Sequence, residues 1–478
     1  MKILLTVFVV FALLIASPAV GALEDPPWQQ PSDWPDRIIA TLTASPATEF
    51  SVNWRTTAGI EQPTAQIVEA KSQARFDLGA RSIEADTEHF SFDPAVAGFK
   101  RKSETDPMKV DPVAYHSVTF SGLEPDTLYA YRLEGAEGNW SSWRHTRTAA
   151  ERGAVEFLYF GDTQQGIRSH VSRVFETAGL VAPEARFMLH VGDLVNTGTN
   201  DRQWAEWFEA GGWLFGRVPS VPVPGNHDYQ RIEETQLPAL TPFWRPQFRL
   251  PVEESLPGEL NETVYDIRYT SDLHLFAIDS TGPYFEKQIQ WLEAGFRASD
   301  AKWRIVYMHH PFFSWVGDGY EKEVQTEKRA QLDEFLADNK VDMVLTGHRH
   351  SYQRAESGAG VHHLDKSEPY EVDTVFLVTA STTNRGTTKQ KGWELFSTER
   401  GGNISLTRWG DYVPLFGIIR VEGDKLEFRA VDALGQTYDA FSLERDDKGR
   451  KIMHNGAAAF GPTWDAESVG SYQQLERH

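Results

Sequence analysis

The chain of 478 residues contains no cysteine. Disulfide bonds, thiolate metal ligands and cysteine nucleophiles are therefore excluded, so packing and any bound metals must hold the fold together. Positive charge is also scarce, because 47 Lys and Arg face 68 Asp and Glu and give a formal net charge of −21. Such a surface repels polyanions, which argues against nucleic-acid binding through a basic face. An anionic ligand would need a local source of positive charge.

Long hydrophobic runs are rare as well. Residues 3–16 are apolar, follow Lys2 and are followed by small residues up to Ala22. This pattern predicts a secretory signal peptide over residues 1–22, and the run is short for a bilayer-spanning helix of about 20 residues. The alternative is an uncleaved membrane anchor. We expect a secreted or periplasmic protein that keeps no stable membrane anchor after cleavage.

The next part of the chain reads as a linker and a β-domain. Residues 23–36 are rich in proline and polar groups, as linkers are. Residues 71–109 lack a clear period and predict a long insertion or hairpin. Five strand-like runs surround them, at residues 37–42, 49–55, 65–70, 114–120 and 129–134. We predict an all-β sandwich over residues 37–149, with packing against its neighbour favoured over a separate binding function.

Five short polar clusters dominate the rest of the sequence, and each follows an apolar run of strand length. They are Gly161-Asp162-Thr163-Gln164, Gly192-Asp193-Leu194-Val195-Asn196, Gly225-Asn226-His227-Asp228, Met308-His309-His310-Pro311 and Gly347-His348-Arg349-His350. Ligands in open α/β sheets gather beyond the carboxyl ends of the strands, so the clusters can meet at one place. Their carboxylates, carboxamides and imidazoles suit Zn, Mn, Fe or Co better than Ca or Mg.

Helical spacing occupies several of the intervals between these clusters. The predicted helices cover residues 171–180, 284–296 and 324–336, with a fourth that Asp201 would cap. The aromatic residues of that fourth helix are interpreted as core in preference to the mouth of a site; they are Trp204, Trp207, Phe208 and Trp213. Residues 235–262 are rich in proline and predict an irregular loop beside the site, and residues 385–408 predict another loop.

The order of the clusters resembles the calcineurin-like metallophosphoesterase superfamily, in its purple-acid-phosphatase-like branch, over roughly residues 36–440. The turn and strand of residues 122–132 resemble a fibronectin-III-like sandwich, which precedes the catalytic domain in that branch. The resemblance implies an α/β domain over residues 154–440, built of βαβ units as a central β-sandwich flanked by helices. Residues 441–478 would form a C-terminal tail.

The resemblance also implies a dinuclear centre of two divalent or trivalent transition-metal ions, Fe, Mn or Zn. Asp193 would bridge the two ions. The remaining ligands divide between the first ion, held by Asp162 and His350, and the second, held by Asn226, His309 and His348.

Two positions depart from the pattern. Gln164 stands where the superfamily often has histidine, and we predict either a weak ligand of the first ion or a neighbour of the ligands. Asn196 stands where purple acid phosphatases carry a tyrosine ligand, so the tyrosinate responsible for the colour is missing. We predict that Asn196 orients a ligand rather than binding metal.

The catalytic assignments rest on residues beside the ligands. His227 follows Asn226 directly, and we predict that it protonates the leaving oxygen or stabilises the transition state. Asp228 is predicted to orient His227 and raise its pKa. Asn226 and His310 are the candidate substrate contacts, with a structural role as the alternative for His310.

A metal pair turns water into a hydroxide nucleophile near neutral pH and neutralises charge on a phosphoryl group. The leading prediction is therefore a secreted phosphomonoesterase that hydrolyses small phosphate esters with metal-bound hydroxide. A phosphodiesterase acting on cyclic nucleotides or glycerophosphodiesters is the first alternative, because the metal centre serves both reactions. A degenerate metal-binding surface protein is the second, because of Gln164 and Asn196. The natural substrate, native metals, pH optimum and oligomeric state stay open.

Overall fold

The computed structural model describes residues 29–100, 109–311, 320–381, 403–411 and 413–456. The predicted signal peptide, the first part of the predicted linker and most of the loop predicted over 385–408 lie outside these residues. None of the helices in the described ranges combines the length and apolar character needed to cross a bilayer.

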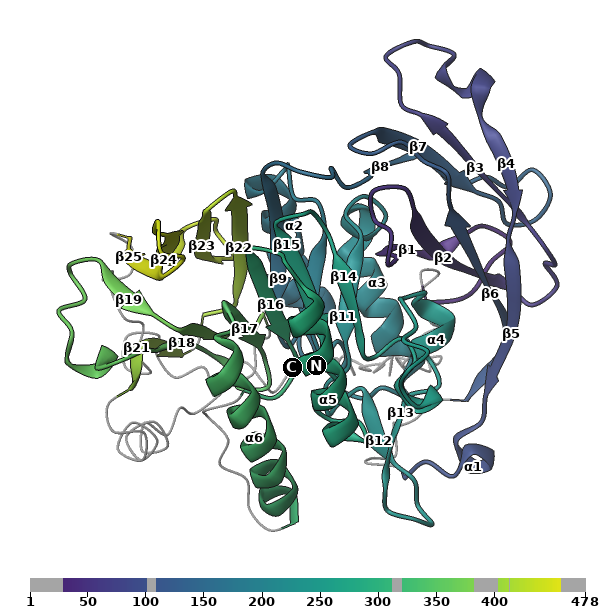
Figure 1. The fold of residues 1–478 in the computed structure, drawn as a ribbon. Helices are drawn as coiled ribbons and strands as arrows, with labels where there is room; N and C mark the ends of the chain where they lie inside the picture. The colour runs from purple at the N-terminus through teal and green to yellow at the C-terminus, as the bar shows by residue number, and fades with distance from the viewer. Residues whose placement is uncertain (1–28, 101–108, 312–319, 382–402, 412, 457–478) are drawn as a thin grey trace, which may run out of the picture.

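The N-terminal domain is a sandwich of two antiparallel sheets, as predicted (Figure 1). One sheet contains β1 (Asp36–Leu42), β2 (Phe50–Thr57), β6 (Val110–Phe120) and β5 (Asp86–Phe92). The other contains β4 (Arg81–Glu84), β3 (Thr64–Glu69), β7 (Leu128–Leu133) and β8 (Arg144–Arg147). Trp54 and Tyr131 fill the space between them and are fully buried. Residues 71–109, predicted as an insertion or hairpin, contain a crossover between the sheets, because their strands β4 and β5 belong to different sheets. The short helix η1 (Phe76–Gly79) precedes β4, and α1 (Pro94–Ala97) follows β5.

The second domain is built around two further groups of strands. Its first group joins the N-terminal sheet through β11, which pairs with β1 in parallel, to give a single sheet of 12 strands. That group consists of β9 (Val155–Phe160), β10 (Met188–Val191), β11 (Ser220–Val223), β22 (Leu415–Glu422), β23 (Lys425–Asp432), β24 (Thr437–Arg445), β25 (Lys451–Asn455) and β19 (Tyr370–Val372). The prediction of a C-terminal tail from residue 441 is therefore wrong for residues 441–455, which include the end of β24 and all of β25. Phe441 and Leu443 of β24 are buried and complete the domain core.

The second group forms a sheet of seven strands that packs against the first. It contains β14 (Tyr265–Arg268), β15 (Leu273–Ala277), β16 (Trp303–Tyr307), β17 (Met343–Thr346), β20 (Thr374–Val378), β18 (Ser351–Ser357) and β21 (Ile404–Asp411). Residues 404–408, which were predicted to end the loop over residues 385–408, thus belong to strand β21. Ile404 of β21 is buried against this sheet, which the sequence pattern did not reveal.

Helices cover the outer faces of the two sheets, and the predicted helices are confirmed. The described helices of this domain are α2 (Ser172–Val181) with the preceding π-turn η2 (Ile167–Val171), α3 (Asp201–Phe215), α4 (Trp244–Gln247), α5 (Phe285–Ala298) and α6 (Tyr320–Asn339), with short turns η3 (Gly258–Leu260) and η4 (Val361–His363). The predicted loop over 235–262 contains α4 and η3, and its β13 (Pro238–Leu240) pairs with β12 (Tyr229–Arg231).

One feature of α3 corrects the prediction for its start. Asn200, not Asp201, caps the helix, because the Asn200 side chain accepts from Gln203 N. Asp201 instead accepts from Arg37 of β1 at 2.7 Å, which ties the two domains together. Trp204 and Trp207 are core residues as expected, whereas Trp213 is 61% exposed.

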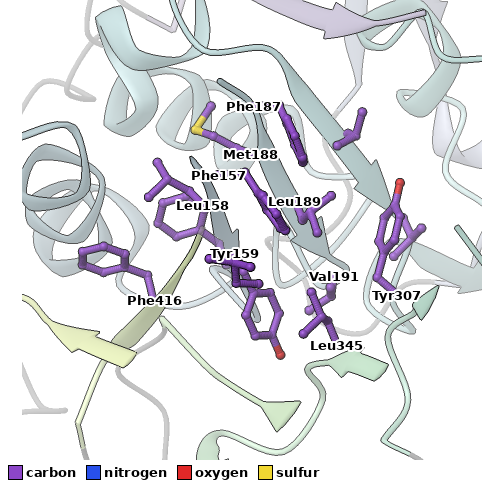
Figure 2. Close-up of a cluster of buried hydrophobic side chains, with 14 of the residues drawn as sticks. Phe157, Leu158, Tyr159, Phe187, Met188, Leu189, Val191, Tyr307, Leu345 and Phe416 are labelled. Carbon is purple, nitrogen blue, oxygen red and sulfur yellow. The ribbon is translucent and has the colours of Figure 1, made fainter. Parts of the chain in front are cut away.

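The space between the two sheets is filled by large apolar side chains, and the hydroxyl of Tyr159 links the two sheets by hydrogen bonds. Figure 2 shows Tyr159 of β9 and Val191 of β10 beside Leu345 of β17, all fully buried. The Tyr159 hydroxyl donates to Thr346 O and accepts from Thr346 N at 3.0 Å. Because Thr346 is the last residue of β17, this contact fixes the carboxyl end of one sheet against the other.

Candidate metal centre

The carboxyl ends of parallel strands from both sheets converge, and each supplies side chains to one site. Asp162, Asp193 and Asn226 follow β9, β10 and β11 of the first sheet. The second sheet supplies three histidines, with His309 after β16, His348 after β17 and His350 just before β18. The apolar runs before the clusters are strands, as predicted, and the expected convergence has its physical basis in the packing of the two sheets.

The ligands predicted for the second ion lie within contact distance of one another. His309 Nε2 is 3.0 Å from Asn226 Oδ1 and 3.2 Å from Asp193 Oδ2, and His348 Nδ1 is 2.8 Å from the same Asn226 oxygen. His309 Nδ1 lies 2.9 Å from Val191 O, which can only accept, so Nδ1 carries a proton. If the His309 ring is neutral, its Nε2 lone pair points at the oxygens of Asn226 and Asp193, which can only accept. A cation bound between Nε2 and these oxygens would remove the repulsion.

The ligands predicted for the first ion leave buried oxygens without partners. Asp162 is fully buried, and neither of its carboxylate oxygens has a hydrogen-bond partner among the described residues. His350 Nε2 lies 3.5 Å from Asp162 Oδ1, and ligand atoms of Asp162, Asp193 and His309 lie within 4.8 Å of one another. Burying a carboxylate without hydrogen bonds costs several kcal/mol, which coordination of a metal would offset. These residues therefore fit two metal ions.

Gln164 presents a third buried oxygen at this site. Its side chain is 3% exposed, and Oε1 has no hydrogen-bond partner in the described part of the chain. A free carboxamide oxygen two residues beyond Asp162 is compatible with a weak ligand, and the prediction for Gln164 stays open.

Three of the predicted ligand residues hold a backbone conformation that is costly for any residue with a side chain. Asp162, Asp193 and His348 have φ values of 39°, 52° and 66°. Such conformations cost about 1–3 kcal/mol each and are concentrated at functional sites. Gly192 allows the loops to approach, because a Cβ there would lie 2.6 Å from Gly225 N and 2.8 Å from His309 Nδ1. The fold thus accepts local strain to bring these ligands together.

The charges of the site are strongly coupled. Burial opposes ionisation of Asp193, but His309 and His227 outweigh it and hold the pKa of the Asp193 carboxyl well below its usual range. Burial also disfavours the His309 cation, yet Asp193 raises the pKa of His309 to about 9. Burial and the charge of His309 push the pKa of His348 well below its ordinary value. Without a metal, a proton on His309 therefore compensates Asp193, and a bound cation would take over that role.

The prediction that Asp228 orients His227 is wrong. The Asp228 carboxylate accepts from Gly225 N at 2.8 Å and from Leu194 N at 3.3 Å, so it fastens two ligand loops together. His227 Nδ1 instead lies 2.7 Å from the backbone oxygen of Asn196. Asn196 therefore orients the imidazole through its main chain, while its side chain accepts from Gln165 Nε2 at 3.3 Å.

A sixth loop, which the sequence reasoning missed, positions His310. Ser280 Oγ accepts from His310 N at 3.0 Å and lies 2.9 Å from His310 Nδ1. Lys328 of α6 holds that loop by donating to Ser280 O at 2.7 Å and Gly282 O at 3.1 Å. His310, His309 and His348 offer ligand atoms within 4.8 Å of one another, so His310 lies at the site. The signal was present, because residues 279–282 form a polar cluster directly after an apolar run.

A sandwich of two sheets that gathers carboxylate, amide and imidazole side chains at its strand ends provides the kinds of ligand that dinuclear metal-dependent hydrolases use. Comparison with known families agrees, since residues 155–352 match the calcineurin-like phosphoesterase family and residues 35–148 match the purple acid phosphatase N-terminal domain. The chain thus carries a calcineurin-like phosphoesterase domain that follows a purple acid phosphatase N-terminal domain.

Individual relatives are more distant. Purple acid phosphatase 21 of Arabidopsis thaliana is 26% identical over 244 residues, which cover 50% of this chain and 53% of that protein. Phosphoenolpyruvate phosphatase of Allium cepa is 26% identical over 253 residues and 50% of each chain. Fe(3+)-Zn(2+) purple acid phosphatase 12 of Arabidopsis thaliana is 25% identical over 257 residues, or 50% of this chain and 52% of that one. The chain thus spans about half the length of the curated relatives it matches.

Two solved structures share the fold over most of the chain. Purple acid phosphatase PPD1 from yellow lupin seeds (Lupinus luteus) has a TM-score of 0.65 at 16% identity and covers 87% of this chain and 75% of its own. PhoD has a TM-score of 0.58 at 13% identity, with 91% and 95% covered. These likenesses confirm the predicted order of a β-sandwich domain and an α/β phosphoesterase domain.

Proposed function

We propose that this chain is a metal-dependent phosphomonoesterase with a dinuclear centre of Fe, Mn or Zn, acting on small phosphate esters outside the cytoplasm. The observation that carries the proposal is the gathering of candidate ligands at one point: Asp162, whose two oxygens have no hydrogen-bond partner among the described residues, and Asn226 and Asp193, which face His309 Nε2. A bound pair of transition-metal ions lowers the pKa of water and neutralises charge on a phosphoryl group.

The residues around this set support catalysis rather than metal storage. His227 and Asn226 are half-buried, so they lie at the open side of the buried ligands. Because the Asn196 carbonyl can only accept, His227 Nδ1 carries a proton and Nε2 is the nitrogen left to exchange one. In the imidazolium state, Nε2 would protonate the leaving oxygen of the ester. The backbone of His227 is also fixed, because its N–H donates to Asp193 Oδ1 at 2.7 Å.

The comparisons support a monoester substrate and mixed metals without deciding either. The relatives include proteins named as phosphatases, and one is named for Fe(3+) and Zn(2+). The retained ligand set speaks against the degenerate surface protein. Export rests on the N-terminal sequence alone, and N-terminal sequencing of the protein recovered from its source would test it; an intact Met1 would contradict cleavage near Ala22.

Ester selectivity and metal reconstitution test the proposed activity. Metal-stripped chain is supplied with Mn²⁺, Zn²⁺ or Fe²⁺ in turn and offered p-nitrophenyl phosphate or its bis ester. We expect metal-dependent turnover with a higher kcat/KM for the monoester. A higher value for the diester would favour the phosphodiesterase alternative. Metal uptake without turnover of either ester would favour the degenerate protein.

A further inference from the structure

The sixth loop of the site, residues 279–283, connects β15 to α5 and is shaped by a buried carboxylate. Asp279 is fully buried, and its Oδ1 accepts from Thr281 N at 3.1 Å and from Gly282 N at 2.7 Å. Its Oδ2 accepts from the hydroxyl of Tyr229 at 2.6 Å. The carboxylate thus holds the turn of its own loop with one oxygen and reaches a distant part of the chain with the other.

Tyr229 belongs to the turn that carries His227. It is buried and is the first residue of β12, two residues beyond that histidine. The turn has anchors of its own, because His227 N donates to Asp193 Oδ1 at 2.7 Å and Asp228 O accepts from Thr241 N at 2.9 Å. Tyr229 therefore offers the sixth loop an attachment to a part of the site that is already fixed.

The other end of this linkage is His310, a candidate substrate contact. Ser280 directly follows Asp279, and its Oγ lies 2.9 Å from His310 Nδ1 and accepts from His310 N at 3.0 Å. Because Asp279 and Ser280 are adjacent in one tight loop, a shift of the carboxylate also moves the serine hydroxyl. A chain of contacts thus runs from Tyr229 through the sixth loop to the imidazole of His310.

The surroundings of the Tyr229–Asp279 pair leave little freedom to replace it. A Cβ at Gly282 would lie 2.5 Å from Asp279 Oδ2 and 2.9 Å from the Tyr229 hydroxyl oxygen, so the loop backbone lies directly against the pair. Gln288 of α5 holds the same backbone, because it accepts from Asp279 N and donates to Asp279 O, both at 3.0 Å. Without the Tyr229 hydroxyl, Asp279 would lose a donor at a buried oxygen, and the loop would shift to replace it.

We propose that Tyr229 is a positioning residue that acts through Asp279 and Ser280 to hold His310 against the phosphoryl group of the substrate. The inference rests on the proposed phosphatase function and deepens it by naming residues that set the affinity for phosphate. Because the turn of His227 is anchored independently, loss of the Tyr229 hydroxyl should displace the sixth loop and leave His227 in place. Binding of the phosphoryl group should therefore weaken, while the rate of the bound complex changes little.

Tyr229→Phe removes the hydroxyl and keeps the ring. The metal-loaded parent and variant are compared by steady-state turnover of p-nitrophenyl phosphate and by calorimetric titration with inorganic phosphate. We expect KM and the Kd for phosphate to rise about ten-fold, with kcat changed by less than about two-fold and metal content unchanged.

The matched control is Tyr352→Phe. The Tyr352 hydroxyl also donates to a buried carboxylate at 2.6 Å, Asp439 Oδ2, but this pair joins strand β18 to strand β24 rather than two loops of the site. The control loses the same kind of buried hydrogen bond and should keep the parent's KM and phosphate affinity. A ten-fold loss of phosphate affinity in both variants would mean that the effect is a general one of destabilisation, and would overturn the proposal.

A double variant tests the route of the effect. If Tyr229 acts through Ser280, then Tyr229→Phe combined with Ser280→Ala should bind phosphate no more weakly than Ser280→Ala alone, whereas independent effects would multiply. Multiplied effects, loss of metal from Tyr229→Phe, or parental KM and phosphate affinity in that variant would each overturn the proposal. Absence of turnover by the parent with any metal would instead refute the proposed function, and the phosphate titrations would still decide whether Tyr229 positions His310.

Discussion

His190 in β10 is a buried imidazole whose surroundings make a sharp prediction about stability and pH. It is 1% exposed, and neither ring nitrogen has a hydrogen-bond partner in the described part of the chain. Aromatic rings enclose it, with Phe160 and Trp207 centred 5.5 Å away and Phe215 at 5.9 Å. Burial in this apolar cage lowers the pKa of His190 to about 3.

The sign of the pH effect follows from this depression. Below the ordinary value of 6.5, the unfolded chain binds a proton at His190 that the folded chain rejects until about pH 3. Stability contributed by the neutral ring is therefore present above pH 6.5 and lost as the pH falls toward 3. A difference of one pKa unit corresponds to about 1.4 kcal/mol, so lowering the pH from 7 to 5 costs roughly 2 kcal/mol through this group.

His190→Leu removes this term while keeping a similar volume. Native-state hydrogen exchange of the β10 amides gives the opening free energy without assuming two-state unfolding of the whole chain. Between pH 7 and 5, we expect the parent to lose roughly 2 kcal/mol more than the variant. His145→Leu, at an exposed position of β8, should keep the parent's pH dependence. If His190→Leu loses as much stability on acidification as the parent, the reasoning about the cage is refuted.

Four further predictions concern the metal centre. Asp193→Ala should lose both metals, measured by metal analysis of the dialysed protein, and turnover with them; retention of one ion would contradict a bridging role. His227→Ala should keep both metals but lose about 10²–10⁴-fold in kcat, and loss of metal would show that the ring is misassigned. Asp228→Ala should lower metal affinity about 10–100-fold in a chelator competition, because it frees two loop amides. Ser280→Ala should reduce kcat/KM about ten-fold by releasing His310, and Ser280→Thr should restore it.

Much of this site could be predicted because its signals are local. An apolar run followed by a short polar cluster marks a strand and the turn beyond it, and β9, β10 and β16 end two residues before Asp162, Asp193 and His309, respectively. The packing of the two sheets then gathers these residues at one place, because it brings the ends of the parallel strands together. Residue type and position along the chain thus sufficed to predict which side chains meet at this site.

The parts that could not be predicted depend on contacts between distant segments. β21 and β24 have mixed composition, and their strand character comes from pairing with β18 and β23 rather than from their own pattern. Ser280 had the right signal, but nothing in its sequence marks His310 as its partner. Adjacency in the sequence also produced a wrong prediction, because Asp228 was expected to orient its neighbour His227.

The failure at Asp228 has a structural cause that bears on how the site tolerates its unusual residues. Adjacent side chains in a tight turn diverge, and Asp228 turns inward to the buried amides of Gly225 and Leu194 while His227 stays at the open side. The imidazole is then oriented by a main-chain oxygen, that of Asn196. A backbone carbonyl performs this task whatever side chain stands at the position. The site can therefore lack the tyrosine expected there and still hold its histidine in place, because the tyrosine position contributes to the orientation of His227 through its backbone.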